Sequence, residues 1–336
     1  MALTNREILL ASRPVGMPTE ENFSLVENSV PNISGGEVLI KTLYLSVDPY
    51  MRGRMRGVRT YVDPFELGKP LTGGVVGKVI ESNHPNFKVG EIVEGRLNWA
   101  DYSTSDGSNI RKVDPSIAPI STAIGAVGMP GLTAYFGLLY IGKPKEGETV
   151  VVSGAAGAVG TIVGQIAKIK GCRVVGIAGT EEKCQYLVNE LGFDVAVNYK
   201  TENVLDSLKK ACPNGVDVYF DNVGGEISDS VMTLINFQSR TVLCGQIAQY
   251  NDVKPSLGPR IQVQLIQRSS MMQGFIVGDF KERNEEGYNQ LGKWVQSGEI
   301  KYHENIVDGL ENAPKAFMGL FTGENIGKQL VKVSEE

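Results

Sequence analysis

The 336-residue sequence is poor in side chains that bind metals or form disulfides. Its four cysteines stand singly and form no C-x-x-C pair: Cys172, Cys184, Cys212 and Cys244. Its two histidines, His84 and His303, do not lie near a cysteine in the sequence. A metal centre or a disulfide framework needs several such residues at characteristic spacings. We therefore expect no metal site, and we interpret the cysteines as small buried thiols of a reducing compartment.

The sequence also lacks a long apolar run and an excess of positive charge. No uninterrupted hydrophobic stretch approaches the roughly 20 residues that span a membrane. Residues 1–7 do not have the pattern of a secretory signal. The net charge of −5 argues against a general affinity for nucleic acids or anionic membranes. We expect a cytoplasmic protein that has neither nucleic acid nor membrane among its partners.

The stretch that organises the sequence reads as a strand, a glycine turn, a helix and a second strand. The β-branched run 149–153 is followed by three glycines, Gly154, Gly157 and Gly160. Apolar residues at helical spacing come next, and the apolar run 173–177 closes the unit. Such a unit binds a dinucleotide at the carboxyl edge of a parallel sheet, because its glycines bring backbone N–H groups close to phosphates. Glycine turns also occur in domains that bind nothing, but the flanking elements favour a cofactor site.

The length of the chain favours two domains. In residues 1–125, short apolar runs alternate with glycine, proline and asparagine turns, and strands are expected at 38–45, 75–81 and 91–95. This spacing is typical of a twisted antiparallel, barrel-like domain. Residues 126–300 instead alternate strands with helices, which requires a parallel sheet with right-handed crossovers.

Within residues 126–300, the apolar patterns predict individual helices and strands. A helix is expected after Pro130, with further helices at 181–191, 203–211, 226–235 and 279–297. Further strands are expected at 195–199, 217–221, 241–244 and 272–277. The last segment, 301–336, has the pattern of a strand, a helix at 313–321 and a strand at 328–333, which suits a return to the first domain.

One segment of the first domain is rich in arginine: Arg52, Arg54, Arg56 and Arg59. A nucleic-acid patch is one interpretation. A mobile surface loop is the interpretation that we favour, because the chain as a whole is acidic. A third interpretation is that the segment borders a substrate cleft, with Arg52 placed to bind a carboxylate or phosphate.

The end of the second strand of the glycine unit indicates which nicotinamide cofactor fits. An NAD site places an acidic side chain there, about 20 residues beyond the glycines, to bind the ribose 2′-hydroxyl. This sequence has Ala-Gly-Thr at 178–180, and Lys183 follows. NADP is favoured, because Lys183 can bind a 2′-phosphate that no carboxylate repels; a solvated surface lysine is the alternative. Glu181 and Glu182 are interpreted as favourable charges at a helix N-terminus.

Five segments carry further motifs, at 47–52, 129–135, 155–160, 220–225 and 244–251. Together they resemble the zinc-independent medium-chain reductases, in the group of leukotriene B4 12-hydroxydehydrogenase and prostaglandin reductase, with 2-alkenal and curcumin reductases as relatives. The resemblance spans nearly the whole chain. Zinc alcohol dehydrogenases carry histidine and glutamate where this chain has Gly73 and Gly74, so zinc chemistry is not expected.

The resemblance implies an α/β fold with two functional parts. A Rossmann domain at 126–300, with a doubly wound parallel sheet, would bind NADP(H). A mainly antiparallel, barrel-like (GroES-like) catalytic domain would occupy 1–125, and 301–336 would return to it. The implied activity is NADPH-dependent reduction of the carbon–carbon double bond of a small α,β-unsaturated aldehyde or ketone, in a cytosolic homodimer.

The resemblance also implies cofactor contacts at named positions. Lys183 would bind the 2′-phosphate, and Tyr199 would lie beside the adenosine. The other implied contacts are Ala155, Ala156, Gly157, Ala158, Val159, Gly160, Asn222, Cys244, Gly245, Gln246, Ile247, Tyr250, Phe275, Ile276, Val277 and Asn325.

Without a metal, the negative charge that develops on the substrate oxygen needs hydrogen-bond donors. Our first candidate is the phenol of Tyr250, which follows the carboxyl end of a strand, where sites on wound sheets gather. The alternative is that Tyr250 packs on the cofactor while a ribose hydroxyl donates. Tyr50 is the second catalytic candidate, and Tyr50, Arg52 and Met129 are expected to line the substrate cleft.

Two other functions stay open at this point. A quinone reductase of the same superfamily would share the fold and the lack of zinc. A non-catalytic NADP-binding protein would bind the cofactor without turnover. Paired assays with an alkenal and a quinone would separate the three.

Overall fold

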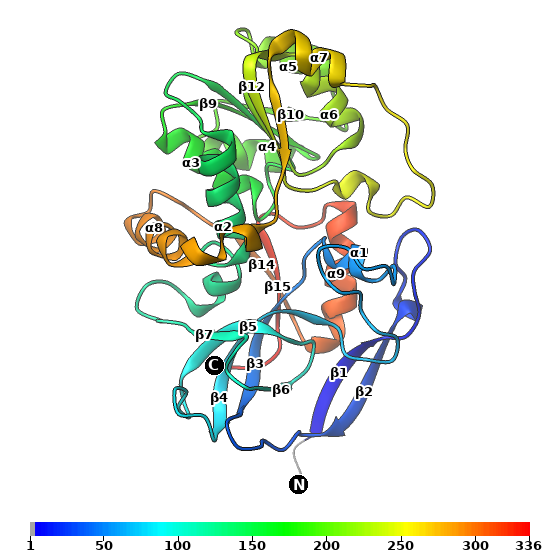
Figure 1. Ribbon diagram of the computed structural model, residues 1–336, viewed down its shortest axis with the longest axis vertical. Coiled ribbons are helices and arrows are strands. Elements are labelled where there is room, and N and C mark those ends of the chain that lie inside the picture. Colours follow the sequence, from blue (N-terminus) through cyan, green and yellow to red (C-terminus); the bar gives the residue numbers. More distant parts are fainter. Residues whose placement is uncertain (1–3) are drawn as a thin grey trace. The chain divides into compact units, whose positions relative to one another are not determined.

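The structure is a computed structural model that describes residues 4–336, and its chain separates into two compact units (Figure 1). The first unit contains the chain up to Gly125 together with Glu304–Asn325 and Gln329–Glu336. The second unit contains Ala126–His303 and Ile326–Lys328. The chain therefore leaves the second unit after His303 and re-enters it for three residues at Ile326.

A mainly antiparallel sheet of seven strands forms the first unit, in the order β14-β15-β3-β4-β5-β7, with β6 paired to β3. These strands are β3 (Val38–Ser46), β4 (Thr72–Ser82), β5 (Ile92–Asn98), β6 (Tyr102–Ser105), β7 (Ile110–Lys112), β14 (Glu304–Asp308) and β15 (Lys328–Lys332). A separate antiparallel pair joins β1 (Thr4–Leu10) to β2 (Phe23–Ser29). Helices α1 (Met51–Arg54) and α9 (Ala313–Thr322) pack on a core that includes Trp99 and Phe317.

A parallel sheet of six strands forms the second unit, in the order β10-β9-β8-β11-β12-β13. Its strands are β8 (Thr149–Ser153), β9 (Arg173–Ala178), β10 (Val195–Asn198), β11 (Val216–Asp221), β12 (Ile235–Leu243) and β13 (Met271–Gly274). The strand order reverses between β8 and β11, so the carboxyl ends of these two strands form the switch point where ligands bind in such sheets.

Helices cover both faces of the parallel sheet. Val150 and Val152 of β8 belong to the apolar cluster that contains α3, whereas Val151 belongs to the cluster that contains α5 and α6. Side chains alternate along a strand, so a strand buried on both faces is apolar throughout. The helices are α2 (Met129–Phe136), α3 (Gly160–Ile169), α4 (Glu181–Gln185), α5 (Val204–Ala211), α6 (Gly225–Met232), α7 (Gln262–Arg268) and α8 (Asn284–Ser297). No helix within residues 4–336 has the length and apolarity needed to cross a membrane.

The expected fold class is confirmed, but several expected bounds are wrong. Helix α6 ends at Met232, and Ile235 already begins β12. Strand β13 ends at Gly274, and α8 begins only at Asn284 because a 3-10 helix, η6 (Val277–Arg283), precedes it. Strands β1 and β2 and helix α7 were not expected from the sequence, because their many polar residues obscure an apolar period.

Candidate functional site

The glycine turn lies at the carboxyl end of β8 and leads into α3. Gly154 has φ 57°, which only glycine adopts easily, and its carbonyl accepts the N–H of Gly157 at 3.0 Å. A Cβ on Gly160 would overlap the Gly154 carbonyl and lie 2.7 Å from the Ala155 Cα. The first residue of the ten-residue helix α3 therefore has to be glycine. The turn places the N-terminus of α3, with its positive dipole end, at the carboxyl end of β8.

The segment Ile326–Lys328 braces this turn. The N–H of Gly327 donates to the Ala156 carbonyl at 2.8 Å, and Gly157 forms a parallel bridge with Gly327. Gly327 has φ 66°, and a Cβ there would overlap the His303 carbonyl. The return of the chain therefore fixes the backbone of the glycine turn, which the sequence alone did not indicate.

The ends of β9 and β10 bring positive charge and an aromatic ring together. Thr180 caps α4 by accepting the N–H of Lys183 at 3.3 Å. Burial lowers the pKa of the half-buried Lys183 ammonium, and the nearby Lys200 lowers it further. A Cβ on Gly179 would lie 2.9 Å from the ring of Tyr199, so the ring stands over that glycine. This corner presents two ammonium groups and a ring face, as an adenosine 2′-phosphate requires.

Asn222 joins the two strands at the switch point. Its side-chain amide donates to the carbonyl of Ser153 at 2.8 Å, and its backbone N–H donates to the Ser153 hydroxyl at 2.9 Å. The carbonyl of Asn222 accepts the N–H of Ile247 at 3.3 Å. The predicted residue Asn222 thus connects the end of β8, the end of β11 and the loop that follows β12.

That loop places Tyr250 at the carboxyl edge of the sheet. The N–H of Gln246 donates to the phenol oxygen of Tyr250 at 3.3 Å, and the same oxygen would lie 3.2 Å from a Cβ on Gly245. The N–H of Cys244 continues the sheet by donating to the Asp221 carbonyl at 2.9 Å. Burial, and then Asp221, raise the pKa of the Cys244 thiol to about 12, so the thiol keeps its proton at neutral pH.

The segment 275–277 leaves the sheet at the same edge. The ring of Phe275 packs edge-on against Phe220 with centroids 6.4 Å apart. Ile276 is 38% exposed, and its N–H donates to the Asp279 carboxylate at 3.1 Å. Val277 begins η6. Phe275 therefore anchors the segment while Ile276 stays open to a ligand.

The arginine segment of the first unit is a surface loop only in its second half, where Arg56 and Arg59 are exposed, so that expectation is wrong for Arg52 and Arg54. Arg52 and Arg54 lie in α1 and are 2% and 9% exposed. Arg52 donates to the carbonyls of Pro14 and Gly16 at 3.2 and 2.8 Å. Its guanidinium therefore braces the backbone of the first unit, which contradicts the expected role of meeting a substrate anion.

Tyr50, which precedes α1, is half-buried in the first unit. Burial, and then the nearby Asp48, raise the pKa of its phenol to about 12, so the hydroxyl keeps its proton at neutral pH. Met129 begins α2 in the second unit, where its carbonyl accepts the Thr133 hydroxyl at 2.7 Å.

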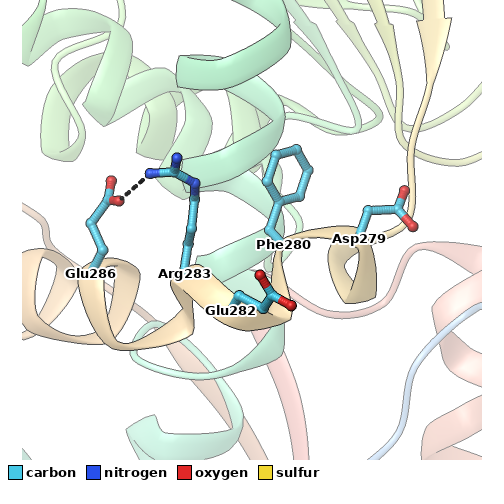
Figure 2. A pocket seen from close by; sticks show the side chains of 5 residues that line it. All are labelled: Asp279, Phe280, Glu282, Arg283 and Glu286. Carbon is cyan, nitrogen blue, oxygen red and sulfur yellow. Dashed lines mark hydrogen bonds and ion pairs between the residues drawn. The ribbon is translucent and has the colours of Figure 1, made fainter.

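A surface pocket of the second unit lies along η6 and α8 (Figure 2). Its lining residues are Asp279, Phe280, Glu282, Arg283 and Glu286. Glu286 pairs with Arg283 at 3.3 Å and accepts the hydroxyls of Tyr135 and Tyr140 at 2.9 and 2.7 Å. Glu286, Arg283 and the two tyrosines thus bond to one another, and Asp279 accepts the N–H of Ile276 at 3.1 Å.

The position at which zinc alcohol dehydrogenases carry histidine is closely packed. A Cβ on Gly73 would lie 2.8 Å from the Met51 methyl group and 2.9 Å from the Ser46 carbonyl. Within residues 4–336, no three His, Cys, Asp or Glu side chains are grouped so as to hold a metal ion.

Comparisons with known proteins match both units. One family model, described as the N-terminal domain of oxidoreductase, matches residues 6–113, and another, described as zinc-binding dehydrogenase, matches residues 158–295. NADPH-dependent curcumin reductase of Escherichia coli is 45% identical over 335 residues, which are 98% of this chain and 97% of that protein. Prostaglandin reductase 1 of Rattus norvegicus is 47% identical over 323 residues, 94% of this chain and 95% of that protein. The crystal structure of CurA from Vibrio vulnificus in complex with NADPH is 48% identical, with a TM-score of 0.94 over 98% of this chain and 100% of that one.

Proposed function

We propose a function from the premise that this chain belongs to the medium-chain dehydrogenase/reductase superfamily, in the group of prostaglandin reductase 1 and NADPH-dependent curcumin reductase. It is accordingly an oxidoreductase, and its cofactor is NADP(H). The proposed reaction reduces the carbon–carbon double bond of a small α,β-unsaturated aldehyde or ketone. The observation that carries this proposal is the full-length similarity, at 45% and 47% identity, to a curcumin reductase and a prostaglandin reductase.

The carboxyl edge of the parallel sheet fits such a cofactor. The glycine turn lets the N-terminus of α3, with its positive dipole end, pack close to the end of β8, which favours a pyrophosphate. Lys183, with Lys200 near it, favours a 2′-phosphate at the end of β9. When bound, NADPH supplies the reducing equivalent as hydride. The further contacts that we propose are Tyr199, Asn222, Cys244, Gly245, Gln246, Ile247, Tyr250, Phe275, Ile276, Val277 and Asn325.

The proposed role of Tyr250 is to donate a hydrogen bond to the substrate oxygen. That oxygen gains negative charge as the double bond is reduced, and a donor aimed at it acts mainly in the transition state. The bond that the phenol oxygen of Tyr250 accepts from the Gln246 N–H supports this role, because it fixes the orientation of the hydroxyl. Tyr50, protonated at neutral pH, is the second candidate donor, and we propose that Tyr50 and Met129 line the substrate site.

We also propose that the protein is a cytoplasmic homodimer that pairs through β13. This strand is the last in the order of the parallel sheet, so one of its edges is open to another strand. Apolar side chains flank the edge, with Ile266 79% and Phe237 64% exposed. Light scattering of the protein is expected to give a dimer mass, and a variant with Ile266→Glu and Phe237→Glu is expected to be a monomer. The four free cysteines suit the reducing cytoplasm.

The test of the reaction measures NADPH oxidation with four substrates of similar size: an alkenal, an enone, the saturated aldehyde and a quinone. We expect turnover of the alkenal and the enone, with the saturated carbonyl compound as product, and no turnover of the saturated aldehyde. Turnover of the quinone alone would instead identify a quinone reductase. NADPH binding without oxidation by any substrate would identify a non-catalytic binding protein.

A further inference from the structure

Asp221, the last residue of β11, is a fully buried carboxylate at the switch point of the sheet. Its Oδ1 accepts the hydroxyls of Ser153 and Tyr219, both at 2.8 Å. The same oxygen accepts the backbone N–H groups of Val223 and Gly224 at 3.0 and 2.9 Å. The hydrogen bonds found within residues 4–336 give this carboxylate neutral donors and no cation. A buried charge is costly without its donors, so Asp221 holds these groups firmly in place.

The donors belong to segments that carry the candidate site. Ser153 ends β8 and precedes the glycine turn, and Val223 and Gly224 form the turn before α6. The second oxygen of Asp221, Oδ2, lies 3.4 Å from the side-chain nitrogen of Gln246, in the loop after β12. One carboxylate therefore connects the ends of β8, β11 and β12.

Gln246 extends this connection to Tyr250. Gly224 has φ 74°, and a Cβ there would overlap the side-chain oxygen of Gln246, so the amide of Gln246 fills the space above this glycine. The backbone N–H of Gln246 donates to the phenol oxygen of Tyr250 at 3.3 Å. Gln246 thus has its side chain against Asp221 and Gly224 and its backbone N–H on the Tyr250 hydroxyl. The loop backbone is also tied to the end of β11, because the N–H groups of Gly245 and Ile247 donate to the carbonyls of Asp221 and Asn222 at 3.1 and 3.3 Å.

We propose that Asp221 is a positioning residue of the reaction, which holds the Tyr250 hydroxyl through Gln246. This inference rests on the proposed function, in which Tyr250 donates to the substrate oxygen. A carboxylate with a structural role alone would affect the stability of the fold but not the share of catalysis that depends on Tyr250.

The same strand offers a matched control. Asp217 lies at the opposite end of β11, where its carboxylate accepts the Thr149 N–H and the Asn236 side-chain amide, both at 2.8 Å. Asp217 joins three neighbouring strands as Asp221 does, but at the amino edge, away from the loop of Tyr250. Asp217→Asn therefore reports the cost of removing a strand-joining carboxylate without changing the candidate site.

The test compares Asp221→Asn with Asp217→Asn in the full-length protein. Asp221→Asn keeps the side-chain volume and removes the charge, and we expect kcat for an enone to fall about 10- to 100-fold. The Kd for NADPH, measured by fluorescence titration, should change less than about threefold, since the lysines and the glycine turn are intact. Asp217→Asn should leave kcat within about twofold of the parent value.

The inference is decided by whether the effect of Asp221→Asn on kcat requires the Tyr250 hydroxyl. In a Tyr250→Phe background, Asp221→Asn should lower kcat less than about threefold, because the group that it positions is gone. An equal loss in both backgrounds, or an equal loss in Asp217→Asn, overturns the inference and leaves the proposed function standing. Full turnover of Tyr250→Phe alone overturns the role of Tyr250 and the inference together.

A second variant decides the matter if Asp221→Asn does not fold. Gln246→Ala removes the connecting side chain from a half-buried position and leaves the buried carboxylate with its other donors. With NADPH saturating for each variant, so that the proposed contact of Gln246 with the cofactor does not enter, we expect a fall in kcat of about 3- to 10-fold in the parent protein and none beyond error in the Tyr250→Phe background. Equal falls in both backgrounds overturn the inference.

Discussion

The two edges of the parallel sheet use polar groups differently. At the amino edge, ion pairs accompany the neutral bonds of Asp217: Arg240 with Glu148, and the more exposed Lys168 with Asp194 at 2.9 Å. At the carboxyl edge, the buried carboxylate of Asp221 holds neutral hydroxyl and backbone donors. The charges of an ion pair neutralise each other and leave little charge to bind a ligand. A carboxylate that accepts backbone N–H groups instead fixes the conformation of the loops that carry them. Substitutions at the carboxyl edge are therefore expected to change binding and turnover, and those at the amino edge to change stability.

Among substitutions at the carboxyl edge, Gly160→Ala is expected to have the largest effect on NADPH binding. The new Cβ would overlap the carbonyl of Gly154 and lie 2.7 Å from the Ala155 Cα, and backbone atoms cannot move aside as a flexible side chain can. We expect the glycine turn to shift, with a loss of about 1–3 kcal/mol in stability and a rise of about 100-fold or more in the Kd for NADPH. Fluorescence titration and thermal melting measure the two effects.

Gly35→Ala is the control for that substitution. No atom lies within 4 Å of a Cβ placed on Gly35, which is in the first unit. This variant should bind NADPH as the parent does. If Gly160→Ala also binds normally, the glycine turn is not where the pyrophosphate lies.

Tyr250→Phe tests the next largest effect at the carboxyl edge. The phenyl ring keeps its packing but loses the hydroxyl that the Gln246 N–H orients. We expect kcat for an enone to fall about 100-fold, as for removal of one donor to a developing oxyanion, with little change in the Kd for NADPH. Steady-state kinetics measure this, and Tyr140→Phe, which loses its bonds to Glu286 and Arg283 away from the candidate site, is the control. A fall in NADPH affinity at constant kcat would mean that Tyr250 only packs on the cofactor.

The parallel sheet and its glycine turn were predictable because the strands on either side of the turn, β8 and β9, are short, mainly apolar runs. The run 149–153 is buried throughout, as a strand covered on both faces must be. By contrast, β1 carries Asn5, Arg6 and Glu7, and Arg6 pairs with Asp101, 95 positions later. A strand that depends on such a distant partner leaves no local pattern in the sequence.

The candidate site was predictable only in its local parts. The carboxyl-edge position of Tyr250 was predicted from its place after a strand. The position of Lys183 at the end of β9 was predicted from its distance to the glycines. The burial of Arg52 was not predictable, because its carbonyl partners on Pro14 and Gly16 lie more than 35 positions away. The role of Asp221 was also hidden, since a carboxylate ending a strand looks the same whether it binds a ligand or the protein's own N–H groups.

Lys183→Ala should have a smaller effect on NADPH binding or turnover than Gly160→Ala or Tyr250→Phe. Removal of one charge-assisted bond to a phosphate costs about 1.5–3 kcal/mol, so we expect the Kd for NADPH to rise roughly 10- to 100-fold. The Kd for NADH, which has no 2′-phosphate, should not change. The amino-edge control is Lys168→Ala, which loses a pair with Asp194 and should leave both constants unchanged. Equal losses for NADPH and NADH would place Lys183 away from the 2′-phosphate.

Arg240→Leu should have the smallest effect on turnover, because it acts at the amino edge. Burial raises the pKa of the Glu148 carboxyl, but Arg240 and the Lys145 N–H outweigh burial and hold that pKa below its ordinary value. A carboxyl group with a depressed pKa in the folded state stabilises the fold above its unfolded pKa, about 4.3, and this stability is lost as the pH falls through the folded pKa. We therefore expect Arg240→Leu to lose about 1–3 kcal/mol at pH 7 and progressively less in acid, with kcat and the Kd for NADPH unchanged. Thermal melts across the acid range measure the difference, and a loss that does not shrink as the pH falls would show that Arg240 acts through its bonds to the carbonyls of Gly142 and Lys143 instead of through Glu148.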